Sequence, residues 1–345
     1  SQTLAAARFV STWMDEGTEF GQYPVVSVRR DAGTDEPYGR AELYTCIPRN
    51  VTSELFDEVA ASVLMSATLR PFDVTEDVLG LEDVASMAYG MGYPEANRRT
   101  FAADVPPLFA ADRNDPETQE AVASLLRDAI RFTPGNTLAF FPSYAEAERY
   151  HDRLAGAGGG GSVGGDGAGT TADLGPIHLD GPGQDEERLR SEFVESDGAA
   201  LFTSLWGTLG EGVSFDGDDA RTVVVVGVPY PNLSERLEAV QDAYDRVYDD
   251  RRGAGWRYAV EIPTIRKTRQ ALGRVIRSPD DFGVRVLLDK RYTRAARDMG
   301  KYGVRGSFPP EERDELIDVA PEKVKFAMLN FYADLDAYDG APPTP

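Results

Sequence analysis

Short apolar runs alternate with amphipathic stretches along most of this chain. The apolar runs predict strands over residues 137–141, 176–179, 199–203, 222–228 and 284–288. Helical spacing of apolar positions predicts helices over 116–130, 144–154, 185–194, 234–249, 263–277 and 321–335. Continuous apolar strands that alternate with helices are typical of a parallel sheet covered on both faces. We therefore expect a doubly wound α/β domain.

The first 80 residues have a different pattern. They predict a helix over 3–14, two short strands over 25–28 and 41–46, a helix over 52–59 and an apolar strand over 62–65. These strands are too few for a sheet of their own, so we interpret the segment as the closing portion of another α/β domain. The predicted division is 1–80 and 81–345. A start at Ser1, without Met, suggests a fragment or a processed chain.

Residues 156–169 contain nine glycines in fourteen positions. A phosphate-binding loop would need a strand, a helix and a Gly-Lys-Ser or Gly-Lys-Thr ending, which this segment lacks. Gly-rich chains of this kind behave as flexible linkers, so we predict a flexible surface insertion.

The net charge is −22, and only five of the 36 basic residues are Lys. A surface rich in carboxylates repels itself in dilute buffer and is tolerated where salt screens it, which favours a salt-loving source; alternatively, the acidity only aids solubility. The single cysteine, Cys46, excludes an internal disulfide or a cysteine metal cage and favours a reducing, intracellular setting. No run approaches the ~20 apolar residues that span a bilayer, so we expect a cytoplasmic protein.

Basic residues concentrate in one segment of this acidic chain. Residues 251–305 contain fifteen basic and five acidic side chains. The segment is either a contact for a polyanion, such as a triphosphate or nucleic acid, or a solvated helix face neutralised by nearby carboxylates.

The most specific pattern in this segment is RQALGRVIR at 269–277. On a continuous helix, Gln270, Arg274 and Arg277 would project from one face. The planar guanidinium of Arg holds two phosphate oxygens at once, and Gly273 permits close approach on the same turn. The pattern predicts a phosphate contact.

Residues 270–278, together with PDDFGVRVLLDKRY at 279–292, resemble motif VI and the following strand of XPD/DinG-type superfamily 2 helicases. The resemblance implies that Gln270 senses the γ-phosphate of ATP and that Arg274 and Arg277 are arginine fingers. It also implies a RecA-like fold for 81–345 and a remnant of the first motor domain in 1–80. VLMSATL at 63–69 is similar to motif III, which implies that Ser66 and Thr68 couple nucleotide state to strand movement.

Two further segments resemble motifs IV and V: TLAFFPSY at 137–144 and LFTSLWGTLGEGVSF at 201–215. The resemblance implies nucleic-acid contacts at Ser143, Tyr144, Thr203, Gly207 and Thr208, and nucleotide contacts at Glu211, Gly212 and Gly273. Such Ser, Thr and Gly residues also occur in ordinary turns, and Tyr144 either stacks on a base or packs in the protein. Ser214 stands where the family has Asp, so the nucleotide contacts expected there are either weaker or supplied by Asp216 instead.

The chain has neither a Gly-rich phosphate loop ending in Lys-Ser or Lys-Thr nor a DEAH-like run. We therefore expect it to be inactive alone, with ATP and Mg²⁺ bound mainly by an upstream motor half, where the family's iron–sulfur cysteines also lie. No metal site is predicted in this chain. The leading hypothesis is the C-terminal motor half of an ATP-dependent, 5′–3′ DNA helicase in DNA repair that binds single-stranded DNA. The alternatives are a non-catalytic RecA-like module that binds nucleic acid or a partner, and an RNA-directed motor.

Overall fold

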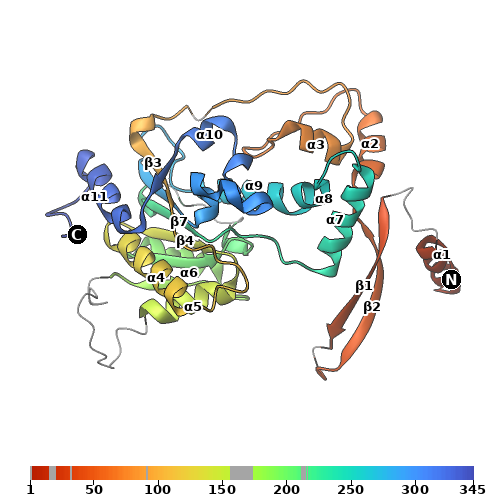
Figure 1. The fold of residues 1–345 in the computed structure, drawn as a ribbon, viewed down its shortest axis with the longest axis horizontal. Coiled ribbons are helices and arrows are strands. Elements are labelled where there is room, and N and C mark those ends of the chain that lie inside the picture. The colour runs from red at the N-terminus through yellow and green to blue at the C-terminus, as the bar shows by residue number, and fades with distance from the viewer. Residues whose placement is uncertain are drawn as a thin grey trace. The chain divides into compact units, whose positions relative to one another are not determined.

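The computed structural model describes residues 2–14, 21–31, 33–90, 92–155, 174–210, 215 and 217–345 (Figure 1). Its contacts divide the chain into two compact units. Unit 1 comprises 1–88 and 230–266, and unit 2 comprises 89–229 and 267–345. The Gly-rich segment 156–169 lies outside the described residues.

Unit 2 is built on a seven-stranded sheet in which every neighbouring pair is parallel. The order across the sheet is β5-β6-β4-β7-β8-β3-β9. The strands are β3 (Arg98–Ala103), β4 (Thr137–Phe141), β5 (Ile177–Leu179), β6 (Ala200–Ser204), β7 (Thr222–Val226), β8 (Gly283–Leu288) and β9 (Leu316–Val319). This order confirms the expected doubly wound, RecA-like α/β class.

The central strands are buried along their whole length because both faces of the sheet are covered. Every residue of β4, β6, β7 and β8 is buried. In register, Thr137 lies opposite both Ala200 and Thr222, and Thr222 lies opposite Val284. Burial on both faces produces the continuous apolar runs that the sequence displays.

Helices on the two sides of the sheet complete unit 2. They are α4 (Pro116–Arg131), α5 (Tyr144–Ala155), α6 (Glu186–Val194), α10 (Pro310–Asp314), α11 (Val324–Asp334) and the end of α9 (Ile262–Leu272). Figure 1 shows α4 and α5 along one side of the sheet and α10 on the other. The carboxylate of Asp115 accepts a hydrogen bond from the Thr118 amide and so caps α4, the longest of these helices.

Unit 1 contains an antiparallel hairpin and several helices. The elements are α1 (Gln2–Met14), β1 (Gln22–Arg30), β2 (Pro37–Thr45), α2 (Arg49–Asp57), α3 (Phe72–Leu79), α7 (Glu235–Val247), α8 (Ala254–Trp256) and a π-helical turn (Arg257–Glu261) that leads into α9. Its core joins the hairpin to α7 and the π-helical turn, with Cys46 packed among Tyr244, Tyr248 and Tyr258. The thiol is buried, as expected, although Cys46 lies immediately after β2 and not within the strand.

Two sequence-based expectations differ from this structure. The predicted strand at 62–65 is not a strand, and the side chains of Val63 and Met65 are 82% and 87% exposed. An apolar run becomes a strand only where a neighbour pairs with it, and the described sheet of unit 1 consists of β1 and β2 alone. Residues 230–266, which the sequence-based division placed in the second domain, belong to unit 1 because their tyrosines pack against Cys46 and Ile47.

None of the helices in the described ranges is long and apolar enough to cross a membrane.

Candidate functional site

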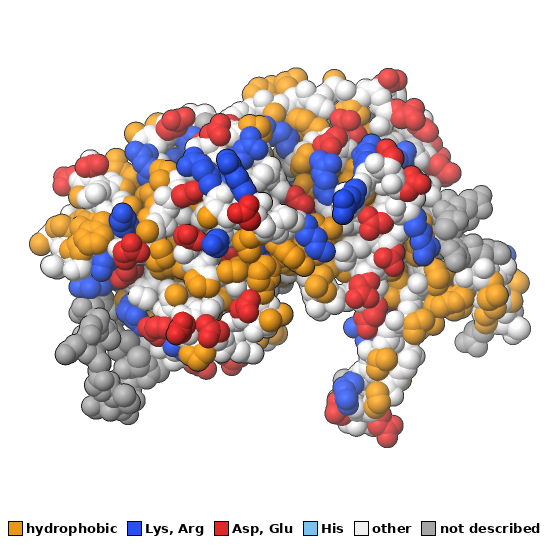
Figure 2. All heavy atoms as spheres, viewed as in Figure 1, with side chains coloured by type: hydrophobic (Ala, Val, Ile, Leu, Met, Phe, Trp, Pro, Cys, Tyr) orange, Lys and Arg blue, Asp and Glu red, His pale blue; other side chains and the backbone are white. Residues whose placement is uncertain are grey.

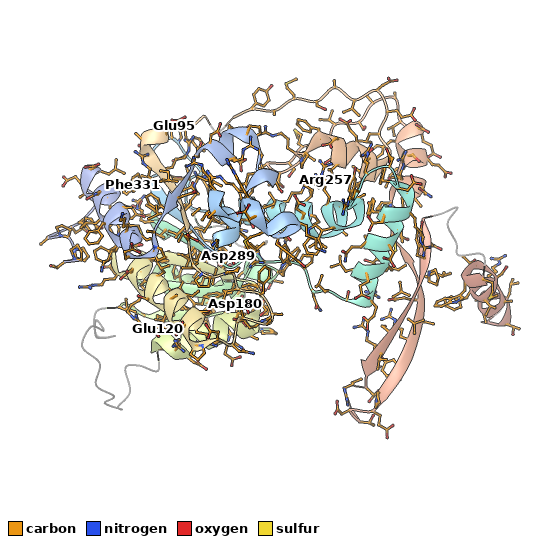
Figure 3. All side chains as sticks on the ribbon, viewed as in Figure 1. Glu95, Glu120, Asp180, Arg257, Asp289 and Phe331 are labelled. Carbon is orange, nitrogen blue, oxygen red and sulfur yellow. The ribbon has the colours of Figure 1, made fainter. Side chains whose placement is uncertain are left out.

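The carboxyl ends of the parallel strands of unit 2 lie at one edge of the sheet, and the motif-like segments follow them. Residues 142–144 follow β4, residues 205–208 follow β6 and residues 227–229 follow β7. In Figure 3, Asp180 after β5 and Asp289 after β8 mark the same edge. This is where open α/β sheets bind ligands.

The three predicted phosphate contacts do not share one helix. Helix α9 ends at Leu272, so only Gln270 is helical, and its side chain is exposed. Arg274 lies in a turn in which its amide donates to the Ala271 carbonyl over 3.0 Å. Arg277 lies in the irregular segment that follows. The predicted continuous helix to Arg277 is therefore wrong.

The early end of α9 has a local cause and a tertiary cause. Gly273, whose amide donates to the Arg269 carbonyl over 3.0 Å, is a poor helix former. Val275 and Ile276 are only 2% and 3% exposed, and such β-branched side chains lose rotamer freedom in a helix. Ending the helix at Leu272 lets both enter the apolar interior.

The charge of Arg274 interacts with those of two other cations. Its side chain is 9% exposed. Burial and the nearby charge of Arg277 lower the pKa of the Arg274 guanidinium, and burial and the charge of Arg274 lower the pKa of the Lys267 ammonium. Because like charges at close range disfavour one another, this cation cluster (Lys267, Arg274 and Arg277) suits an anionic ligand.

Lys267 was not predicted as a site residue. It lies on α9 three residues before Gln270, so the helical spacing that identified Gln270 could have identified it. Its ammonium lies 5.4 Å from the centre of the Trp206 ring, and the Trp206 indole N–H donates to the Pro229 carbonyl over 3.1 Å. Lys267 thus joins the segment after β6 to the cation cluster.

Two predicted hydroxyl contacts are engaged within the protein. Thr203 is 1% exposed, and its Oγ1 donates to Asp180 Oδ2 over 2.6 Å. Burial raises the pKa of the Asp180 carboxyl. Ser143 Oγ accepts from the Glu146 amide over 3.3 Å at the start of α5, as in ordinary helix capping. Both hydroxyls therefore order the loops at the sheet edge.

Tyr144 packs against the loop after β6. Burial and the charge of Asp180 raise the pKa of the Tyr144 hydroxyl, while hydrogen bonds with Thr208 act in the opposite direction. A Cβ on Gly207 would lie 2.3 Å from the Tyr144 hydroxyl oxygen, so only glycine fits there without displacing the ring. This contact favours packing over base stacking for Tyr144.

Ser66 and Thr68 form a local turn in unit 1. Ser66 Oγ accepts from the Thr68 amide over 3.1 Å and lies 3.3 Å from Thr68 Oγ1. The carbonyl of Leu69 then accepts from Thr75 Oγ1 and from Arg266 Nη2, each over 2.7 Å. The motif III segment is thereby tied to α3 and α9 within its own unit.

The basic segment 251–305 divides into buried and exposed charges. Arg291 pairs with Asp289 inside the protein, and Arg285 pairs with Glu315. The exposed basic residues of its last part are Arg294, Arg297 and Lys301. Figure 2 shows Lys and Arg gathered near α10 and Asp and Glu gathered around α5 and α6. Internal ion pairs therefore account for part of the basic segment.

Three positions singled out from the sequence, Glu211, Gly212 and Ser214, lie outside the described residues. Gly273 lies between α9 and Arg274, beside the cation cluster. Across the ranges that the structure describes, no group of three or more His, Cys, Asp or Glu side chains is arranged to hold a metal ion.

Comparison with known proteins identifies similar chains. Residues 126–302 match the family model for the helicase C-terminal domain. Over 273 residues the chain is 27% identical to the Schizosaccharomyces pombe general transcription and DNA repair factor IIH helicase subunit XPD, covering 73% of this chain and 33% of that protein. It is 31% identical over 128 residues to the Caenorhabditis elegans regulator of telomere elongation helicase 1 homolog, covering 35% of this chain and 13% of that protein.

A solved XPD helicase structure has the same fold. It superposes with a TM-score of 0.60 at 20% identity, covering 90% of this chain and 50% of that one. This chain spans about a third of the length of the fission yeast relative. Because the family model covers just over half of the chain, the chain belongs to the helicase C-terminal domain family, as a C-terminal region of the XPD/DinG type of superfamily 2.

Proposed function

We propose that this chain is the C-terminal motor half of an ATP-dependent DNA helicase. The observation that carries the proposal is the placement of the motif-like segments after the carboxyl ends of β4, β6 and β7, with Arg274 and Arg277 in the segment that leads into β8. The charge of Arg274 interacts with those of Lys267 and Arg277, and such a cluster of cations suits the phosphates of ATP. The similarity to helicases supports phosphoryl transfer as the reaction.

The residues have distinct roles in this proposal. Gln270 contacts the γ-phosphate, and Arg274 and Arg277 are arginine fingers that stabilise the charge of the transition state. Glu211, Gly212 and Gly273 contribute contacts beside the nucleotide. Residues 1–80 are a remnant of the first motor domain, in which Ser66 and Thr68 couple nucleotide state to movement. Residues 81–345 are the second motor domain, of which 230–266 share a compact unit with 1–88.

ATP and Mg²⁺ are held mainly by an upstream motor half, which is the chain's partner and carries the iron–sulfur cluster if the full-length protein has one. Single-stranded DNA runs along the sheet edge. Gly207, Thr208 and Ser143 contact its backbone, and Tyr144 and Thr203 hold their loop in place. By resemblance, the full-length protein moves 5′–3′, is cytoplasmic and acts in DNA repair.

The test uses ATP hydrolysis by the full-length protein with and without single-stranded DNA. Replacing Arg274 or Arg277 by Ala lowers kcat by about 10³-fold or more, as loss of an arginine finger does. Arg188→Ala, on the exposed surface of α6, is the matched control and leaves kcat unchanged. This chain alone hydrolyses no ATP.

Turnover of ATP by this chain alone, or full activity of both Arg variants, would overturn the proposal. If the chain is instead a RecA-like binding module without motor activity, the full-length protein binds single-stranded DNA, and neither Arg variant changes its rate of ATP hydrolysis. Competition between DNA and RNA strands for the full-length protein separates the DNA motor from an RNA-directed one.

The acidic composition supports a salt-loving source, because 58 acidic residues stand against 36 basic ones. Under this proposal, the melting temperature rises across a potassium chloride series as salt screens the repulsion. A melting temperature that falls steadily in high salt contradicts it.

A further inference from the structure

The backbone around Arg277 is held by the carboxylate of Asp281, a residue to which none of the motifs assigns a role. Asp281 Oδ2 accepts hydrogen bonds from the amides of Arg277 and Ser278, each over 2.8 Å. The Asp281 amide donates back to the Ser278 carbonyl over 3.3 Å, which closes the turn. Asp281 is 8% exposed, so its carboxylate is largely shielded from competing water. Hydrogen bonds to a shielded carboxylate are among the stronger ones in proteins.

A second segment holds the same turn from outside. The Tyr93 hydroxyl donates to the Arg277 carbonyl over 2.6 Å, and Asn97 Nδ2 donates to the Pro279 carbonyl over 3.1 Å. Tyr93 lies just before the short helix η2 (Glu95–Asn97), and Asn97 is its last residue; Glu95 is labelled in Figure 3.

The segment around Tyr93 is itself held in place by other residues of unit 2. The guanidinium of Arg98 donates to the Tyr93 carbonyl and pairs with Glu315 over 2.7 Å. Arg98 begins β3, which pairs with β8 immediately after the turn, with Arg98 opposite Gly283. The backbone of Arg277 is thus fixed on both sides, its amide by Asp281 and its carbonyl by Tyr93.

We infer that Asp281 and Tyr93 are positioning residues that hold the Arg277 guanidinium in the geometry for phosphoryl transfer. The inference rests on the proposed function, since it concerns the finger role of Arg277. Neither side chain contacts the nucleotide in this scheme. An arginine that acts only in the transition state depends on a preset backbone, because small displacements of a catalytic group cost large factors in rate.

The experiment measures kcat and KM for ATP in the full-length protein. Asp281→Ala lowers kcat about 10-fold to 100-fold with little change in KM, and Tyr93→Phe lowers kcat about threefold to tenfold. Asp281→Asn keeps an acceptor oxygen and recovers most of the loss. Asp280→Ala, an exposed neighbour that removes the same charge, is the matched control and stays at the wild-type rate.

A double-mutant cycle separates positioning from general stability. In an Arg277→Ala background, Asp281→Ala and Tyr93→Phe lower kcat no further, because the group that they position is absent. A further loss of kcat in that background, or a wild-type kcat for Asp281→Ala, overturns this inference but leaves the proposed function standing. A wild-type kcat for Arg277→Ala overturns the proposed function itself. If Asp281→Ala fails to fold, Tyr93→Phe in both backgrounds decides the question.

Discussion

Asp289 and Arg291 form an ion pair that is almost completely shielded from solvent, with 0% and 1% exposure. Asp289 Oδ1 accepts from the Arg291 amide and Nε over 2.9 and 2.8 Å, and Oδ2 accepts from Nη2 over 2.6 Å. Oδ2 also accepts from the Leu108 amide over 3.2 Å. The pair therefore ties the end of β8 to the loop that follows β3.

Asp289→Ala removes all four acceptor contacts and leaves a buried guanidinium without its carboxylate. Breaking a buried pair in this way costs about 3 to 5 kcal/mol, a large part of the 5 to 15 kcal/mol that stabilises a typical domain. Removing both charges costs less, because the uncompensated charge is then absent. Asp289→Ala with Arg291→Met should therefore recover about 2 kcal/mol relative to Asp289→Ala alone.

Hydrogen exchange of peptides from β8 and β3 is the suitable assay, because a chain with two units need not unfold in one step. A loss of about 3 kcal/mol raises the opening equilibrium more than about a hundredfold. Asp298→Ala, an exposed change on the same segment, is the control. The reasoning fails if Asp289→Ala exchanges at the rate of that control, or if the double variant is no slower than Asp289→Ala.

Three further predictions concern other parts of the chain. Gly207→Ala forces the Tyr144 ring away from the loop that follows β6 and should weaken the binding of single-stranded DNA severalfold, as measured by fluorescence anisotropy. An unchanged affinity for single-stranded DNA would contradict the proposed contact between this loop and the DNA. Burial raises the pKa of the Cys46 thiol to about 12, so at pH 8 a disulfide reagent should modify it only after denaturation, and rapid native modification would refute this. A lowered pKa for the Arg274 guanidinium means that its charge opposes folding at neutral pH, so Arg274→Met should abolish ATP hydrolysis by the full-length protein without lowering the melting temperature. A large drop in melting temperature would assign Arg274 to stability instead.

Local pattern predicted the central strands of unit 2 well because both faces of each strand are buried. The apolar runs at 137–141 and 284–288 needed no partner information to be recognised. By contrast, β3 begins with Arg98 and Arg99 and was not predicted. Arg98 is accommodated at the start of a strand because Glu315, more than two hundred residues away in sequence, neutralises it. A local pattern carries no information about such a partner.

The conformation of the candidate site differs from the sequence-based prediction. Helical periodicity extended α9 to Arg277, whereas burial of Val275 and Ile276 ends it at Leu272. Lys267 was not predicted, because its interactions with Trp206 and with the charge of Arg274 depend on tertiary structure. The apolar run at 62–65 was predicted to be a strand and is not one. The pattern of apolar residues does not show whether a neighbouring strand is available to pair with the run.

The buried arginines of this chain lie in two kinds of electrostatic environment. Arg291 and Arg285 are buried against the carboxylates of Asp289 and Glu315, so their charges are neutralised by the fold itself. Arg274 is similarly buried, yet the charged groups that perturb it include Arg277 and its own charge perturbs Lys267. The fold thus neutralises one set of buried arginines with carboxylates and brings the charge of Arg274 into interaction with two other cations. Groups with perturbed pKa values cluster at functional sites, so this difference in environment supports the proposed contact of Arg274 with a phosphate.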